Sequence, residues 1–389
     1  MKKYLNIYIN KMDFDTFILI FIIIILFIKI LTVSCNYKIT ENFDESKIKT
    51  KEIAESKIVE FSYDKYGPYI QKYYSPMNIL DLKTIPVNQD GKIFCSVASY
   101  RDKQCPLTIR DMIDKAKYPN KLVICICQQN NTDADDDCIN NYKNEKNAII
   151  KIMRITDKDA RGPCWARFLI QQEWRGEEYF LQIDSHMRFV QDWDEKCIND
   201  INQLPPKACL TNYVSNFNLE SGVPDTSNQL RGPLKIVNKE TTDDGFFRVN
   251  SDFIDSTNTP LLAWGWSACF SFSKSDILYD AGYDPYTQFL FFGEEMDIWA
   301  RMYTNGWLVY APSTPICFTS FDRSYRPTFW ENPDQMDGEY LARLRLYYKF
   351  GYLNEIPKEL MIGLENYSLG TTYTWQEFLE FCLDEKLSP

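Results

Sequence analysis

Residues 179–189 read YFLQIDSHMRF, a short apolar run that ends abruptly in an aspartate, a serine and a histidine. Similar runs occupy residues 93–100, 122–127 and 148–155. Stretches with helical spacing lie between them, at 107–117 and 163–174. Short buried-type runs separated by helical patterns predict βαβ units and a mainly parallel sheet. The sequence therefore predicts an α/β fold with these runs as strands.

The polar residues that follow the runs are the first candidates for a site, because open α/β sheets bind ligands at the carboxyl ends of their strands. Asp184 and His186 lie two apart, so in an extended segment their side chains share one side. A carboxylate oxygen and an imidazole nitrogen can there converge on one Mn²⁺ or Mg²⁺ that bridges a diphosphate. The alternative is a capped turn around an ordinary hydrogen-bonded histidine.

Composition excludes several classes of function. His186 is the only histidine of the 389 residues, which rules out a three-histidine zinc site, and a Ser-His-Asp triad would have to use His186 itself. With 54 acidic against 43 basic side chains, the net charge is -11. Because nucleic-acid affinity rests largely on neutralising phosphates with Lys and Arg, we expect no nucleic-acid partner.

Twelve cysteines leave two interpretations open. Cys125 and Cys127 lie two apart in an apolar run, where a strand places both on one face. Buried free thiols that behave as small hydrophobic side chains are the favoured interpretation, and disulfides or metal ligation are the alternative.

Residues 17–28, FILIFIIIILFI, form an unbroken apolar run. Extension to residues 16–33 gives a length that spans a bilayer, and the apolar residues outweigh Lys29, which lies near one end and can snorkel. We expect a retained single-pass anchor of type II, with a cleaved signal segment as the alternative. The expected organisation is a tail and anchor (1–35), a stem (36–90), a catalytic domain (91–350) and a C-terminal helical extension (351–389).

Six blocks, in order along the chain, carry a family resemblance. They are SVASYRD (96–102), ARGPCWAR (160–167), YFLQIDSHMRF (179–189), WGWSACFSFSK (264–274), FGEEMDIW (292–299) and RSYRPTFWE (323–331). Together they resemble the hydroxyproline-directed α-N-acetylglucosaminyltransferases of the cytoplasmic F-box adaptor type and, more distantly, the mucin-type polypeptide N-acetylgalactosaminyltransferases. The resemblance implies a GT-A fold. It also implies a retaining, metal-dependent transfer of N-acetylglucosamine from UDP-GlcNAc to a hydroxyl, on a protein or glycan acceptor.

The resemblance also implies roles for individual residues. Asp184 and His186 would be the metal ligands, and Glu294 and Glu295 would lie near the sugar and the acceptor. The residues implied on the nucleotide side are Ser99, Tyr100, Arg101, Asp102, Arg161 and Gly162. For Glu294 and Glu295 the alternative is that they simply open a helix, since acidic side chains are favoured in a first turn.

Two further pairs have chemical interpretations of their own. Trp264 and Trp266 fit a wall for the sugar ring or its N-acetyl group, because flat rings pack on apolar sugar faces; a core aromatic pair is the alternative. Arg323 and Arg326 are placed to neutralise a diphosphate from the other side, with ordinary surface arginines as the alternative.

One position departs from the family pattern. Where the family is expected to have a second metal histidine, four residues before an arginine, this chain has Thr319. Asp322 or Thr319 itself would be the substitute ligand. The alternative function is therefore a catalytically weak or inactive GT-A pseudoenzyme that binds a UDP-sugar or a glycan.

Overall fold

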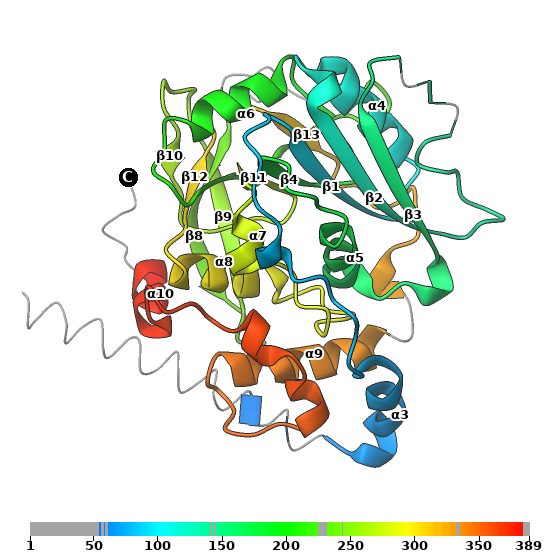
Figure 1. The fold of residues 1–389 in the computed structure, drawn as a ribbon, viewed down its shortest axis with the longest axis vertical. Coiled ribbons are helices and arrows are strands. Elements are labelled where there is room, and N and C mark those ends of the chain that lie inside the picture. Colours follow the sequence, from blue (N-terminus) through cyan, green and yellow to red (C-terminus); the bar gives the residue numbers. More distant parts are fainter. Residues whose placement is uncertain are drawn as a thin grey trace, which may run out of the picture. The chain divides into compact units, whose positions relative to one another are not determined.

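The computed structural model describes residues 54–55, 58, 61–140, 142–143, 145–224, 232–242, 244–331 and 335–383 (Figure 1). They belong to one compact unit. The expected membrane segment, residues 16–33, lies outside these ranges. Within them, no helix combines the length and the apolar character that crossing a bilayer requires.

The central feature is an eight-stranded sheet in the order β10-β12-β6-β11-β4-β1-β2-β3. Its strands are β1 (Ile93–Tyr100), β2 (Leu122–Asn130), β3 (Ile149–Thr156), β4 (Tyr179–Asp184), β6 (Ala208–Thr211), β10 (Leu261–Leu262), β11 (Phe270–Lys274) and β12 (Leu308–Ala311). β1 pairs in parallel with β2 and β4, and β2 with β3. The prediction of a parallel sheet was made from the apolar runs within residues 93–183, and the strands in that range are parallel. The sheet as a whole is mixed, because β11 runs antiparallel to both β4 and β6.

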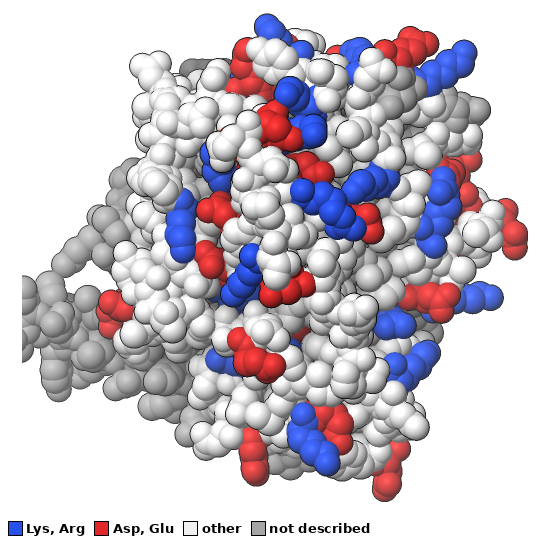
Figure 2. Space-filling view, in the orientation of Figure 1, with Lys and Arg blue, Asp and Glu red and all other residues white. Residues whose placement is uncertain are grey.

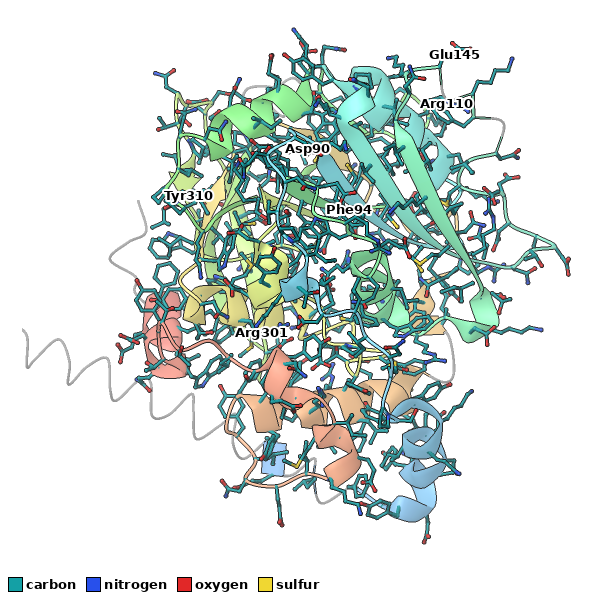
Figure 3. All side chains as sticks on the ribbon, viewed as in Figure 1. Asp90, Phe94, Arg110, Glu145, Arg301 and Tyr310 are labelled. Atoms are coloured by element: carbon teal, nitrogen blue, oxygen red, sulfur yellow. A yellow bond between two sulfur atoms is a disulfide. The ribbon has the colours of Figure 1, made fainter. Side chains whose placement is uncertain are left out.

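Helices bury both faces of this sheet (Figure 1). α4 (Cys105–Lys115) and α6 (Trp193–Ile201) share one core cluster with Ile93, Cys95 and Val97 of β1. The intervening residue Phe94 faces the other side, where its ring stacks on Phe180 with centroids 6.3 Å apart (Figure 3). α5 (Gly162–Gln171) packs against β1 and β2. Burial on two faces explains why these strands read as continuous apolar runs.

Two small sheets and two helices complete the surroundings of the strand ends. β5 (Met187–Phe189), β13 (Cys317–Thr319) and β7 (Ser215–Asn216) form one sheet, and β8 (Leu234–Thr241) with β9 (Phe247–Phe253) forms a hairpin. α7 (Ile277–Ala281) leads into a connection that ends at α8 (Glu294–Thr304).

Residues 61–90, which were expected to form part of the stem, pack against the rest of the compact unit. α3 (Tyr63–Tyr73) buries Tyr66, whose ring stacks on Tyr340 of α9 (Gln335–Lys349) with centroids 4.5 Å apart. The Gln288 side chain donates to the Tyr73 carbonyl at 3.1 Å. The buried residues of this helix, Tyr66, Ile70 and Tyr73, recur at the i, i+4, i+7 spacing of an amphipathic helix, with tyrosine at two of the three positions. At the other end, α10 (Trp375–Leu383) packs on α8, with the rings of Phe378 and Trp299 4.9 Å apart.

The cysteines follow the favoured interpretation, with one exception. Cys105 and Cys138 form a disulfide, and the other cysteines of the described ranges are free and mostly buried. Burial raises the pKa of Cys125 and Cys127 to about 12. On the surface, basic and acidic side chains are interspersed over the face drawn in Figure 2.

Candidate active site

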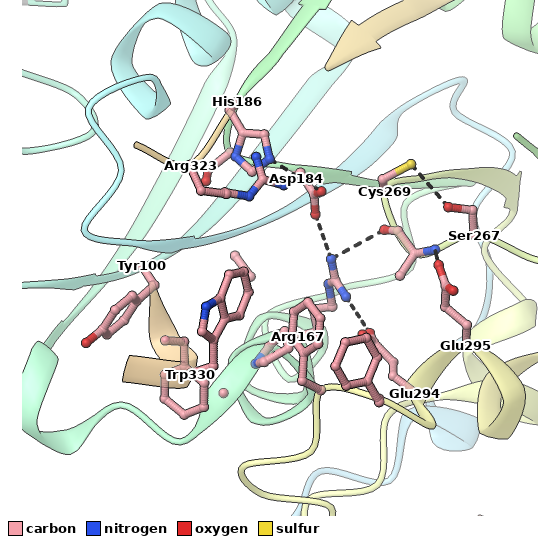
Figure 4. Close-up of a pocket in the computed structure, with 18 of the residues that line it drawn as sticks. Tyr100, Arg167, Asp184, His186, Ser267, Cys269, Glu294, Glu295, Arg323 and Trp330 are labelled. Carbon is pink, nitrogen blue, oxygen red and sulfur yellow. Dashed lines mark hydrogen bonds and ion pairs between the residues drawn. The ribbon is translucent and has the colours of Figure 1, made fainter. Parts of the chain in front are cut away.

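A cavity of about 260 Å³ lies at the carboxyl ends of β1, β2 and β4 (Figure 4). The first loop residues and the last strand residues reach it because these three strands are parallel and end at the same edge of the sheet. The predicted site residues that line it are Tyr100, Gly162, Asp184, His186, Glu294, Glu295, Arg323 and Arg326.

Asp184 and His186 lie together at one wall of the cavity. The His186 Nε2 atom is 3.7 Å from an Asp184 carboxylate oxygen, and its Nδ1 atom is 2.8 Å from the Asp102 carboxylate. Asp102 favours the tautomer with the proton on Nδ1. The Nε2 atom then presents a lone pair, and it is buried without a hydrogen-bond partner among the described residues. A carboxylate behind a histidine is the usual support of a metal-ligating imidazole.

Asp102 does not line the cavity but connects several groups that do. It accepts hydrogen bonds from the hydroxyls of Ser185 and Tyr325, at 2.7 and 2.9 Å, and pairs with Arg326 at 3.4 Å. Burial acts to raise the pKa of this carboxyl, but the hydrogen bonds from His186 and Ser185 and the charge of Arg326 outweigh burial and hold the pKa well below its usual range. Asp102 is therefore an anionic anchor for the His186 ring.

Arg167 of α5 links the Asp184 carboxylate to the helix that carries the two glutamates. Its guanidinium donates to Asp184 at 3.0 Å and, through another nitrogen, to Glu294. The Tyr283 hydroxyl donates to the same Glu294 oxygen. Burial disfavours the charged form of Arg167, but Glu294, Tyr283 and Asp184 outweigh it and raise its pKa. Glu294 is thus committed to an internal ion pair.

Glu295 faces the cavity with a different set of partners. One carboxylate oxygen accepts from the Ala268 backbone N–H at 3.0 Å, and the other accepts from the Tyr213 hydroxyl at 3.2 Å. Burial raises the pKa of Glu295 to about 7 and the charge of Glu294 adds to this, against the lowering effect of these hydrogen bonds. Near neutral pH, Glu295 can therefore both donate and accept a hydrogen bond.

The remaining predicted residues lie outside the cavity lining. Ser99 alternates with Tyr100 along β1 and is fully buried. Arg101 pairs with Asp135 at 2.8 Å, and the Arg161 guanidinium lies over the rings of Tyr73 and Trp165.

The two tryptophans predicted to form a sugar wall are core residues in this structure. The Trp266 indole donates to the Ser271 hydroxyl at 2.9 Å, and the Trp264 ring lies 4.8 Å from the ring of Phe381 on α10. Both are buried, and neither lines the cavity. Trp264 thus packs against α10, and Trp266 is held by a hydrogen bond to β11.

The two substitute metal ligands are not at the cavity either. The Thr319 hydroxyl donates to the His186 carbonyl at 3.4 Å, and Asp322 accepts from the Ser324 backbone N–H in an exposed turn. Across the residues that the structure describes, no group of three or more His, Cys, Asp or Glu side chains could hold a metal ion. Of the residues predicted as metal ligands, Asp184 and His186 line the cavity, and Thr319 and Asp322 do not.

Several lining residues escaped the sequence interpretation. Arg167 lies in the ARGPCWAR block, and its position one helical turn after Cys164 on the inward face of α5 was a usable signal. Tyr213 follows β6 in an irregular loop without a pattern. Phe292, Phe321 and Trp330 line the cavity while about half of each ring remains exposed, which gives the opening an aromatic rim.

Comparison with known proteins gives a family match. The model of a family described as Glycosyltransferase (GlcNAc) matches residues 92–152 and 142–384, and no curated protein matches. The crystal structure of GalNAc-T7 with UDP, GalNAc and Mn²⁺ is similar with a TM-score of 0.54 and 11% identity, over 84% of this chain and 66% of that one. S. aureus TarS in complex with UDP-GlcNAc has a TM-score of 0.43 and 14% identity, over 69% of each chain. At such identity the likeness to GalNAc-T7 shows the fold alone, a mixed α/β sheet of the GT-A kind.

Proposed function

The chain belongs to the GlcNAc glycosyltransferase family, and from this premise we propose that it transfers N-acetylglucosamine from UDP-GlcNAc to a hydroxyl acceptor, with retention of configuration and with a divalent metal. In this reaction the bond from the anomeric carbon to the UDP oxygen breaks. The acceptor oxygen bonds to that carbon on the same face, and the acceptor proton leaves with UDP. Hydroxyls on a protein or a glycan are the proposed acceptors.

The observation that carries the proposal is the orphaned Nε2 atom of His186. It is buried, it lies beside the Asp184 carboxylate, and Asp102 fixes the ring that bears it. These donors fit Mn²⁺ or Mg²⁺, which would neutralise negative charge on the diphosphate. GalNAc-T7, whose fold is similar, was crystallised with UDP, GalNAc and Mn²⁺. Asp184 and His186 are the residues that would hold the ion.

The chain's own cations supply the rest of the diphosphate's counter-charge. Arg323 and Arg326 line the cavity, and Gly162 brings the N-terminus of α5 to the same wall. Gly162 has a φ of 86°, and a Cβ there would lie 3.1 Å from the Phe329 ring and 3.2 Å from the Phe289 backbone. A phosphate is favoured at such a helix N-terminus because its N–H groups are unpaired and the dipole is positive there.

Glu295 is the proposed contact for the sugar. Its carboxyl can donate or accept toward a sugar hydroxyl, whereas Glu294 is held by Arg167 and Tyr283 and serves to position the helix start. We place the protein at a membrane through residues 16–33, with the catalytic unit following the anchor.

A donor screen tests the proposal. The full-length protein with Mn²⁺ should release UDP from UDP-GlcNAc faster than from UDP-GalNAc, UDP-Glc or UDP-Gal, and Asp184→Asn should abolish release. Asp322→Asn is the matched control, since Asp322 lies in an exposed turn outside the cavity, and it should leave the rate unchanged. No release from any UDP-sugar, together with no shift of the unfolding temperature by UDP, would refute the proposal.

The two-ligand site also favours a second candidate, a pseudoenzyme that binds a UDP-sugar without transferring it. Thr319 bonds to a carbonyl and offers no ligand at the cavity, so metal affinity depends on Asp184 and His186 alone. A UDP-dependent rise of the unfolding temperature without turnover would support this candidate. Turnover in the donor screen would exclude it.

A further inference from the structure

Gln129, near the end of β2, lines the cavity and carries a buried hydrogen-bond acceptor that has no partner among the described residues. Its neighbours on the strand face the other way: Gln128 accepts from the Cys138 backbone at 2.7 Å, and Asn130 donates to the Asp136 carbonyl at 2.8 Å. The Asn130 Oδ1 atom is also buried without a hydrogen-bond partner among the described residues, but Asn130 does not line the cavity. Strand alternation turns Gln129 toward the same side as Tyr100, its partner on β1, and both line the cavity.

The Gln129 amide has one fixed end and one open end. Its Nε2 atom donates to the Ser99 carbonyl at 3.5 Å, while its Oε1 atom is buried and has no partner among the described residues. The side chain as a whole is only 2% exposed. Rotating the amide by half a turn would set two carbonyl oxygens against each other, so the outward atom is the acceptor. Buried acceptors in folded proteins nearly always have a partner, which points to a ligand donor.

The surroundings of this acceptor suit a flat base. Tyr100, Gly162, Pro163 and Phe329 line the cavity beside Gln129, and the rings of Tyr100 and Phe329 meet edge to face with centroids 5.5 Å apart. Such walls offer stacking surface and few competing polar groups, because proline lacks an N–H.

We propose that Gln129 selects the nucleobase, with its Oε1 atom accepting the N3–H of uracil. Cytosine carries an unprotonated acceptor nitrogen at this ring position, so it would face the Gln129 oxygen with a second acceptor and bind more weakly. This inference rests on the proposed function, in that it assumes a pyrimidine nucleotide donor, and it assigns the choice of that pyrimidine to one side chain.

Nucleotide binding without turnover tests the assignment. Affinities of the full-length protein for UDP, CDP and N3-methyl-UDP are measured by titration calorimetry in Mn²⁺. The wild type should bind UDP about tenfold more tightly than the other two, the worth of about one hydrogen bond. Gln129→Leu should weaken UDP about tenfold and leave CDP within about twofold, so that the preference disappears.

Gln128→Leu is the matched control, because the same change one residue away alters a side chain on the opposite face. It should lower the unfolding temperature but keep the UDP preference. A wild type that binds UDP and CDP equally overturns the inference, and so does a Gln129→Leu variant that keeps the preference. The N3-methyl-UDP comparison requires no variant, so it decides the matter if Gln129→Leu does not fold. If the protein binds no nucleotide at all, the proposed function is overturned as well. If the protein releases UDP from a UDP-sugar but Gln129→Leu keeps the preference for UDP over CDP, only this inference is overturned.

Discussion

Glu295 makes the stability of the fold depend on pH in a direction opposite to that of most carboxylates. Its pKa is raised from 4.5 to about 7 in the folded protein, chiefly by burial. At about 1.4 kcal/mol for each pKa unit, the shift corresponds to about 3 kcal/mol, and partial solvent exposure of the side chain reduces this to about 2 kcal/mol. The raised folded-state pKa contributes stability that is fully present below pH 4.5. That stability is lost as the pH rises through 7, because the folded state must then ionise a buried group.

The assay is urea unfolding of the full-length wild type and of Glu295→Gln between pH 4.5 and pH 8, followed by tryptophan fluorescence. Glutamine keeps the size of the side chain and cannot ionise, so the free energy of unfolding of the variant should rise by about 2 kcal/mol relative to the wild type across this range. Glu145→Gln, at an exposed position, is the control and should show no such trend. If the difference in free energy of unfolding between Glu295→Gln and the wild type does not change with pH, or changes in the opposite direction, Glu295 is not a buried carboxyl with a raised pKa.

Three further predictions concern groups that hold the site in place. Asp102→Asn should weaken Mn²⁺ affinity about 10- to 100-fold in a metal titration, because the His186 ring loses the carboxylate that orients it; unchanged affinity would contradict this. Arg345→Met removes the nearer of two cations that pair with the buried Asp284 carboxylate and leaves Lys349 at 3.6 Å, so the free energy of unfolding in urea should fall by about 1–3 kcal/mol, and adding Asp284→Asn should restore part of it. Gly293→Ala should cost about 1–3 kcal/mol in the same assay, since φ is 107° and the new Cβ lies 3.1 Å from Leu346; wild-type stability would speak against this strain.

The sequence predicted those parts of the site that depend on local pattern. Asp184 and His186 follow a buried strand directly, so strand period and strand direction were enough to bring them to one edge of the sheet. Trp264 and Trp266 were predicted to lie in the site because two tryptophans beside a strand give the same sequence pattern whether they face a sugar or pack in the core. The face that such a pair presents is decided by distant packing, which local periodicity does not contain.

The residues that were missed come from contacts made far apart in the chain. Tyr213 reaches Glu295 across 82 positions, and Arg167 reaches Glu294 across 127. Neither pairing leaves a trace in spacing or composition. Distant contacts also decide how residues 61–90 pack. A tyrosine can be exposed or buried, and the partners that bury Tyr66 and Tyr73 lie far away in the sequence.

The packing of residues 61–90 into the compact unit also limits how far a membrane-anchored enzyme of this kind could work from its bilayer. If residues 16–33 span the membrane, only residues 34–53 lie between the span and the described part of the compact unit, in which Ala54 is already buried. At about 3.3 Å for each fully extended residue, that connection covers at most about 65 Å, roughly a third of what a linker to residue 90 would allow. Acceptors carried on the same membrane would then be favoured over those in free solution, because the anchor raises their local concentration around the cavity.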